Sequence, residues 1–140
     1  MAAFNSGAKH QIRNETIFTD LGLNFIPHPV TKNVPVLKNE VAIKRAVRNL
    51  ILTNYYERPY NPGFGGNITA YLFENFTPIT KASIERAIQD AFEQYEPRAD
   101  LIDATVVPNP DLNGLVVNIT FSPLNTREVD QLSFTVERIR

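Results

Sequence analysis

Residues 78–107 read PITKASIERAIQDAFEQYEPRADLIDATVV, and within them the spacing of the apolar residues changes from a helical repeat to a strand repeat. In the first part, apolar residues return every three or four positions, at Ile84, Ala87, Ile88, Ala91, Phe92 and Tyr95. This spacing puts them on one face of a helix. Pro97 disfavours helical backbone at the preceding residue, so we expect the helix to end at Glu96. In LIDATVV the period is two, which is typical of a strand with one face formed by Ile102, Ala104 and Val106.

Two further segments with a strand period follow. In LVVNITF, residues 115–121, one face is formed by Leu115, Val117, Ile119 and Phe121. In QLSFTVERIR, residues 131–140, polar residues alternate with Leu132, Phe134 and Val136. The connecting stretches, PNPDLNG and SPLNTREVD, are rich in turn-forming residues. Three successive strands joined by short turns predict an antiparallel meander whose apolar face needs a cover.

Amphipathic helices upstream of the strands can supply that cover. Residues 39–54, NEVAIKRAVRNLILTN, have an apolar stripe with helical spacing, made of Ile43, Val47, Leu50 and Ile51. Residues 68–76 predict a short helix with Leu72 and Phe73 in the core. The expected fold class is therefore α+β: a small antiparallel C-terminal β-meander covered on one face by two long amphipathic helices and a short one.

The opposite face of the 39–54 helix carries three basic residues, Lys44, Arg45 and Arg48. Such a run is typical of a solvated helix face. The alternative is a surface that docks onto an acidic partner, and the sequence leaves both interpretations open.

Length and composition exclude several classes of protein. A chain of 140 residues fits a single domain, which we expect at 16–140, after a flexible N-terminal arm at 1–15. A net charge of −1 gives no electrostatic footprint for nucleic acid or an anionic membrane. The chain has no cysteine, and His10 and His28 lack metal-ligand spacing, so we expect no metal and no cofactor. No segment approaches the length of apolar run that spans a bilayer.

Two irregular stretches flank the 39–54 helix. Residues 16–37 carry three prolines and predict one short strand around 18–26, followed by an extended loop. Residues 55–66, YYERPYNPGFGG, predict a structural loop built by Arg58, Pro59, Pro62, Phe64 and Gly65. We expect Tyr60 and Phe64 to anchor this loop to the core, and Arg58 to donate hydrogen bonds to loop carbonyls. Phosphate binding by the glycines is disfavoured, because no lysine follows them and no strand precedes them.

The sequence offers carboxylates without a catalytic arrangement. The pair that a glycoside hydrolase needs could come from Glu57, Glu74, Glu96 and Asp100. Nothing in the sequence places two of them in one cleft, and the nucleophile elbow, the phosphate-binding loop and HExxH are missing. We therefore expect no enzymatic activity, and a lysozyme-type glycoside hydrolase with paired carboxylates is the alternative. A free-standing regulatory binding module is a third class.

The stretch QYEPRA, residues 94–99, ends the long helix and has two interpretations. In one, Pro97 only stops the helix, and Glu96 and Arg98 form a local surface ion pair worth about 0–1 kcal/mol. In the other, the proline fixes Glu96 and Arg98 on a rigid corner. There the planar fork of arginine donors can dock onto carboxylates or helix-end carbonyls of another protein. In both, the position at a helix end predicts no core role for Arg98.

From residue 57, the stretch ERPYNPGFGGNITAYLFENFTPITKASIERAIQDAFEQYEPRADL resembles the signature region of the contractile-tail baseplate wedge family, the sheath initiators. This family includes the lysozyme-like wedge component of T-even-type phages and the TssE component of type VI secretion. Four elements match in order: the RP-x-x-P-x-FG loop, the LFEN-x-TP helix start, the amphipathic helix, and YEPR at its end. The resemblance runs from about Leu37 to the C-terminus and includes the strand meander.

The resemblance implies a structural role in the baseplate of a contractile phage tail. It implies six copies around the tail tube that join the wedges to the tail sheath and initiate sheath assembly. It places them in the virion tail baseplate, after assembly in the host cytoplasm. Contact with the tail tube itself is compatible with it.

Carried onto this chain, the resemblance assigns two docking regions. Docking on the core-bundle proteins of the wedge falls to Glu96, Pro97 and Arg98. Addition of a C-terminal strand to strands of the tail sheath protein falls to Gln131, Leu132, Ser133, Phe134, Thr135, Val136, Glu137, Arg138 and Ile139.

Overall fold

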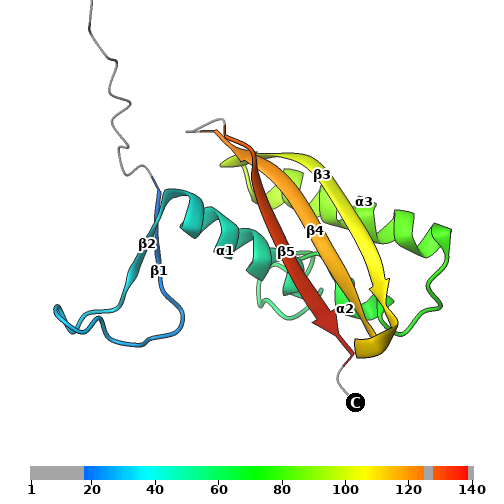
Figure 1. Cartoon of the computed structure of the whole chain (residues 1–140), viewed down its shortest axis with the longest axis horizontal. Coiled ribbons are helices and arrows are strands. Elements are labelled where there is room, and N and C mark those ends of the chain that lie inside the picture. Colours follow the sequence, from blue (N-terminus) through cyan, green and yellow to red (C-terminus); the bar gives the residue numbers. More distant parts are fainter. Residues whose placement is uncertain (1–17, 125–127, 139–140) are drawn as a thin grey trace, which may run out of the picture.

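The computed structural model describes residues 18–124 and 128–138 and confirms the α+β fold (Figure 1). The arm expected at 1–15 lies outside the described residues, and so does Ile139. Along the chain the elements are β1 (Thr19–Leu21), β2 (Val36–Lys38), α1 (Asn39–Leu52), α2 (Ile68–Tyr71), α3 (Pro78–Tyr95), β3 (Ala99–Asn109), a 3-10 helix (Pro110–Leu112), β4 (Gly114–Pro123) and β5 (Asp130–Glu137). None of the helices in these ranges is both long enough and apolar enough to cross a membrane.

The strands β3, β4 and β5 form the expected antiparallel meander, with β4 in the centre. The helices lie on one face of this sheet, with α3 on the β3 side and α1 on the β5 side (Figure 1). The short strands β1 and β2 form a separate antiparallel hairpin that projects from the start of α1. The sequence predicts a loop where β2 lies, because three residues are too few to show a strand period.

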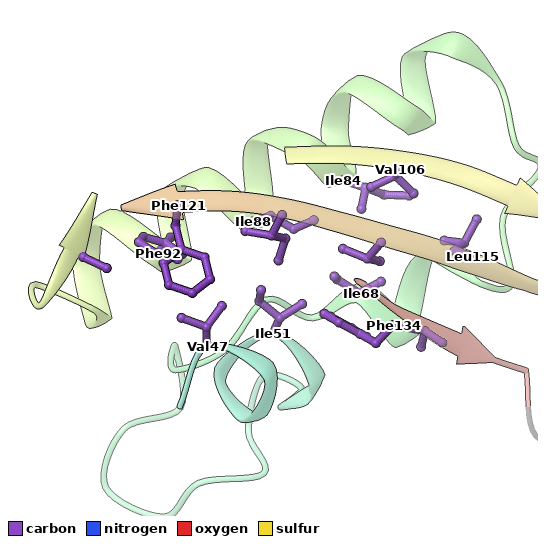
Figure 2. Packing of buried hydrophobic residues seen from close by; sticks show 14 of the residues in the cluster. Val47, Ile51, Ile68, Ile84, Ile88, Phe92, Val106, Leu115, Phe121 and Phe134 are labelled. Carbon is purple, nitrogen blue, oxygen red and sulfur yellow. The ribbon is translucent and has the colours of Figure 1, made fainter. Parts of the chain in front are cut away.

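The core lies between the sheet and the helices, as Figure 2 shows. The predicted stripe of α1 is fully inside it, and so is the face of β4 formed by Leu115, Val117, Ile119 and Phe121. The ring of Phe92 on α3 packs against the ring of Phe121 on β4, with centroids 6.1 Å apart. Both periodic patterns therefore predicted the buried faces correctly.

Both ends of α3 lie where local chemistry puts them. The side chain of Thr77 accepts a hydrogen bond from the backbone N–H of Thr80, at 3.2 Å, and Pro78 occupies the first turn. At the other end Glu96 is the last residue whose N–H joins the helix, donating to the carbonyl of Phe92 at 2.9 Å. The predicted stop before Pro97 is confirmed.

The short helix is shorter than the sequence predicts. α2 ends at Tyr71, and the side chain of Phe73 is 62% exposed, so its expected place in the core is wrong. Leu72 is partly buried and packs against the core. Phe73 instead lies beneath the guanidinium of Arg138, whose carbon is 4.7 Å from the ring centroid.

A bulge changes which residues of β3 face the core. The register of β3 on β4 shifts between Leu101 and Asp103, so one extra residue lies on the β3 side. Ile102 is consequently 55% exposed, and Leu101 packs against the core in its place. The expected face of Ile102, Ala104 and Val106 is wrong at its first member, because a bulge reverses the alternation that a strict period of two assumes.

Because of the bulge, we expect Leu101→Ala to destabilise the fold more than Ile102→Ala, the reverse of what the strict alternation predicts. Leu101→Ala should lower the free energy of unfolding by about 2 kcal/mol, because it removes packed methyl groups. Ile102→Ala should change it by less than about 0.5 kcal/mol, because that side chain faces water. Urea denaturation of both variants measures the two values. A larger loss for Ile102→Ala would contradict the bulged register.

Candidate functional site

The corner between α3 and β3 is built around a buried carboxylate. The side chain of Glu96 is 4% exposed, and both of its oxygens accept hydrogen bonds from Arg98. Nε of Arg98 lies 2.5 Å from Oε1, and Nη2 lies 2.6 Å from Oε2. Such a bidentate ion pair is stronger and more directional than a single hydrogen bond. The expected local ion pair between Glu96 and Arg98 is therefore confirmed, but its place at the surface is wrong for Glu96, because the carboxylate is inside the protein.

Arg98 also joins the corner to the N-terminal hairpin. Its guanidinium carbon lies 5.7 Å from the ring centroid of Phe18, the residue before β1. Phe18 is held to the start of α1 by two hydrogen bonds with Asn39: the N–H of Asn39 donates to its carbonyl at 2.8 Å, and its own N–H donates to Oδ1 of Asn39 at 3.3 Å. The expectation that Arg98 has no role in the packed structure is therefore wrong.

Electrostatics favour the charged form of this guanidinium. The pKa of Arg98 is raised, first by its hydrogen bonds to the Glu96 carboxylate and further by attraction to Glu96 and Asp20. Partial burial acts in the opposite direction. The side chain of Arg98 is 28% exposed, and Pro97 is exposed. The corner therefore presents a permanently charged guanidinium at the surface, and the buried Glu96 carboxylate fixes its position.

The loop at 55–66 is a structural unit, as the sequence predicts for most of its residues. The ring of Phe64 packs on Tyr95 of α3, with centroids 4.8 Å apart, and the Tyr95 hydroxyl donates to the carbonyl of Gly63 at 3.2 Å. Arg58 lies over the outer side of Phe64, 4.5 Å from the ring centroid. This contact replaces the expected donation to loop carbonyls. Tyr60 is fully exposed, so its expected role as an anchor is wrong.

Gly65 is required where the loop passes the end of α1. Its φ is +121°, in the region that favours glycine. A Cβ at this position would also collide with the carbonyl oxygen of Thr53. The glycines of this loop thus serve backbone geometry.

Two of the four carboxylates that could form a hydrolase pair, Glu57 and Glu96, are engaged in other contacts. Both oxygens of Glu96 are occupied by Arg98, and both oxygens of Glu57 accept hydrogen bonds from Asn54. The bond from the Asn54 backbone N–H, followed by that from its side chain, lowers the pKa of Glu57. Glu74 borders a shallow cavity whose other lining residues are not carboxylates. Within 18–124 and 128–138, no three residues of the metal-binding types gather at one point.

The two edges of the main sheet differ. On β3, the backbone N–H of Val106 points away from β4 and donates to Oε1 of Glu85 on α3, at 3.1 Å. At this position the outward N–H of the edge is therefore occupied by a side chain of α3. The sequence shows Glu85 only as a solvent-facing helix residue, so this role was not predictable from spacing.

Among the described residues, β5 pairs only with β4, so its other backbone side is open. The N–H of Arg138 donates to the carbonyl of Asn113 in the turn before β4, at 3.3 Å. Because antiparallel strands alternate, even-numbered residues of β5 bond to β4 and odd-numbered residues direct their N–H and C=O groups outward. The first of these, Gln131, donates to Oδ1 of Asp130 at 2.9 Å. The outward groups of the remaining strand belong to Ser133, Thr135 and Glu137.

The basic residues of α1 lie beside β5 and the N-terminal hairpin. Nζ of Lys44 is 2.7 Å from Oδ1 of Asp130, at the start of β5. The guanidinium of Arg48 lies 6.0 Å from the ring centroid of Phe134. Arg45 donates to Oδ1 of Asn24 in the hairpin loop at 2.8 Å. The expected solvated face is confirmed for Arg48, which is exposed, while Lys44 and Arg45 are half-buried; all three residues flank β5 or the hairpin.

Comparison of the chain with known proteins identifies its family. The family model described as baseplate wedge protein gp25 matches residues 38–129. The chain belongs to the baseplate wedge protein gp25 family. Its relative from Enterobacteria phage T4, baseplate wedge protein gp25, is 38% identical over 92 residues, which span 65% of this chain and 70% of the T4 protein. The matched region includes the loop and the Glu96–Arg98 corner and ends just before β5.

Solved structures show the same fold. A protein from Geobacter sulfurreducens, described as a candidate tail lysozyme, aligns with a TM-score of 0.62 at 24% identity, over 70% of this chain and 89% of that one. A chain of the anti-feeding prophage baseplate aligns with a TM-score of 0.60 at 21% identity, over 84% and 83%. A chain of the postcontracted pyocin R2 baseplate aligns with a TM-score of 0.54 at 16% identity, over 86% and 99%.

We expect removal of Arg98 and removal of Glu96 to lower the free energy of unfolding by different amounts. Arg98→Ala should lower the free energy of unfolding by about 3 kcal/mol, because it leaves the Glu96 carboxylate buried without a partner. Glu96→Ala should cost only about 1 kcal/mol, because Arg98 keeps some access to water. Denaturant unfolding of both variants at neutral pH measures the difference. The double variant should be no less stable than Arg98→Ala, and equal losses in the two single variants would contradict the arrangement.

Proposed function

We propose that this chain joins the wedges of a contractile-tail baseplate to the tail sheath and initiates sheath assembly, without catalytic activity of its own. Six copies would surround the tail tube, assembled in the host cytoplasm. Membership of the wedge family supports the place in the baseplate. The observation that carries the sheath-joining role is the open backbone edge of β5, while on the opposite edge the outward N–H of Val106 is occupied by Glu85.

Sheath engagement falls to the β5 edge in this proposal. Outward N–H and C=O groups at Ser133, Thr135 and Glu137 can pair with an extended segment of the tail sheath protein, which extends the sheet by one strand. The inward side chains Phe134 and Val136 are buried, so β5 stays anchored in its own core. The strand can therefore act as a fixed template.

Wedge docking falls to the corner formed by Glu96, Pro97 and Arg98. The two bonds to Glu96 use Nε and one N–H of Nη2 of Arg98, which leaves both N–H groups of Nη1 and the second N–H of Nη2 for a partner. Glu96 is then a positioning residue, because its carboxylate is buried and holds the guanidinium at a fixed orientation. Pro97 is exposed beside it and can contact the partner directly.

A structural role also accounts for the carboxylates better than hydrolysis does. A retaining or inverting glycosidase needs two carboxyl groups facing one cleft. Here Glu96 holds Arg98 and Glu57 shapes its own loop through Asn54. The fold likeness to a candidate tail lysozyme does not supply a pair of carboxylates.

Blocking the β5 edge should separate the two docking roles. Thr135→Pro removes one outward N–H and places a ring at the edge, while the hydrogen bonds to β4 come from the even-numbered residues. We expect baseplates that contain this variant to assemble wedges but to carry at least about tenfold fewer sheaths by electron microscopy. Thr135→Ala, which keeps the N–H, is the matched control and should behave as the unchanged chain. Sheaths of normal number and length on Thr135→Pro baseplates would contradict strand addition.

The corner has its own test. Arg98→Lys keeps a positive charge for Glu96 but loses the planar fork, so the chain should stay folded while binding to wedge proteins weakens about tenfold. Arg86→Lys, the same substitution at an exposed position of α3, is the control and should bind normally. Pull-down with purified wedge proteins measures both, and circular dichroism verifies folding. Equal capture of the two variants would sink the docking role of Arg98.

A further inference from the structure

Two neighbouring hollows lie beside β5, on the face of the sheet that α1 covers, and they differ in chemistry. The first, of about 520 Å³, lies between α1 and Leu132 and is bordered by Lys44, Arg45 and Arg48. The second, of about 450 Å³, is mostly apolar at its surface and is lined by Leu52, Leu72, Phe73 and Val136 together with Thr69, Thr135, Glu137 and Arg138. Leu52 at the end of α1 borders both. A strand added to β5 would run directly over these hollows.

The first hollow carries positive charge that the chain itself does not neutralise. Lys44 is paired with Asp130. Within the described part of the chain, Arg45 and Arg48 make no ion pair: Arg45 donates to a neutral amide, and Arg48 lies over an aromatic ring. Two guanidinium groups beside an open strand edge favour a carboxylate on whatever binds there.

The distance between the two hollows can be expressed in residues of β5, because Leu132 borders the first and Val136 borders the second. Residues of β5 that face α1 are Leu132, Phe134 and Val136. A residue placed opposite one of them on an added antiparallel strand points its side chain to the same face. From Leu132 to Val136 is four positions, or about 13 Å at the rise of a strand.

We infer that the segment that adds to β5 carries a carboxylate opposite Leu132 and an apolar side chain opposite Val136, four positions apart on its α1-facing side. This inference rests on the strand addition proposed above and gives the added segment a chemical signature. A second copy of this chain does not fit through its own β5, because the α1-facing residues Leu132, Phe134 and Val136 are all apolar and none can supply the carboxylate. The occupant is therefore an extended segment of another protein, with an acidic residue at a defined register.

The test gives the full chain its own candidate strand. A short Gly/Ser linker after Arg140 carries the segment TLTVTET, which folds back antiparallel and places leucine opposite Val136 and glutamate opposite Leu132. A second fusion carries TLTVTKT. Linking the segment in this way raises its effective concentration to the millimolar range, so a weak pairing becomes visible. Amide hydrogen exchange at Ser133, Thr135 and Glu137 reports the pairing.

We expect the glutamate segment to slow exchange at these amides at least about tenfold more than the lysine segment. In Arg45→Glu/Arg48→Glu the preference should reverse in favour of the lysine segment. Lys32→Glu/Arg86→Glu makes the same change in net charge away from β5 and should leave the preference unaltered.

The outcomes separate this inference from the proposed function. Equal protection by both segments would overturn the charge signature while leaving strand addition in place. Protection by neither would overturn both. Selective protection, combined with normal sheaths on Thr135→Pro baseplates, would support the signature of the edge and reject the tail sheath protein as its occupant.

Discussion

The buried pair between Glu96 and Arg98 is the contact on which the corner of this fold depends. A carboxylate that is 4% exposed loses its hydration and needs a charged partner with good geometry. Pro97 ends the helix between the two residues, and this lets side chains two positions apart face each other. Arg98, once held by Glu96, lies over Phe18, which is tied to α1 through Asn39. One pair thus links α3, β3 and the N-terminal hairpin.

The sheet that leaves this corner has a chemical asymmetry between its edges. On the β3 side, α3 lies close enough for Glu85 to accept from the strand backbone. On the β5 side, α1 stays below the strand and contributes basic side chains instead of acceptors. A sheet with two open edges would invite uncontrolled pairing. If strands add to β5 as proposed, the charge pattern beside this edge would restrict pairing to segments that match it.

The sequence predicted the parts of the fold that follow from local period. The helical stripe of α3, the stop at Pro97 and the buried face of β4 could all be predicted from spacing alone. The bulge at Ile102 could not, because Leu101 and Ile102 are both apolar and the sequence fits either residue in the core. The burial of Glu96 and the pairing of Lys44 with Asp130 depend on which elements pack together, and a charged residue at a helix end looks the same whether it is buried or exposed. The resemblance predicted the family, and the placement of α1 beside β5 came only from the structure.

Stability and docking compete for the same guanidinium. Moving Arg98 toward a partner would strip Glu96 of both hydrogen bonds, and the carboxylate has too little access to water to replace them. In the proposed docking, a bound state must therefore keep the internal pair intact. It would use the three N–H groups that the pair leaves, two on Nη1 and the second on Nη2. These can donate two parallel bonds to a carboxylate, or single bonds to carbonyls at the C-terminal end of a helix. The wedge partner would therefore supply acceptors to the outer edge of a guanidinium that stays bound to Glu96.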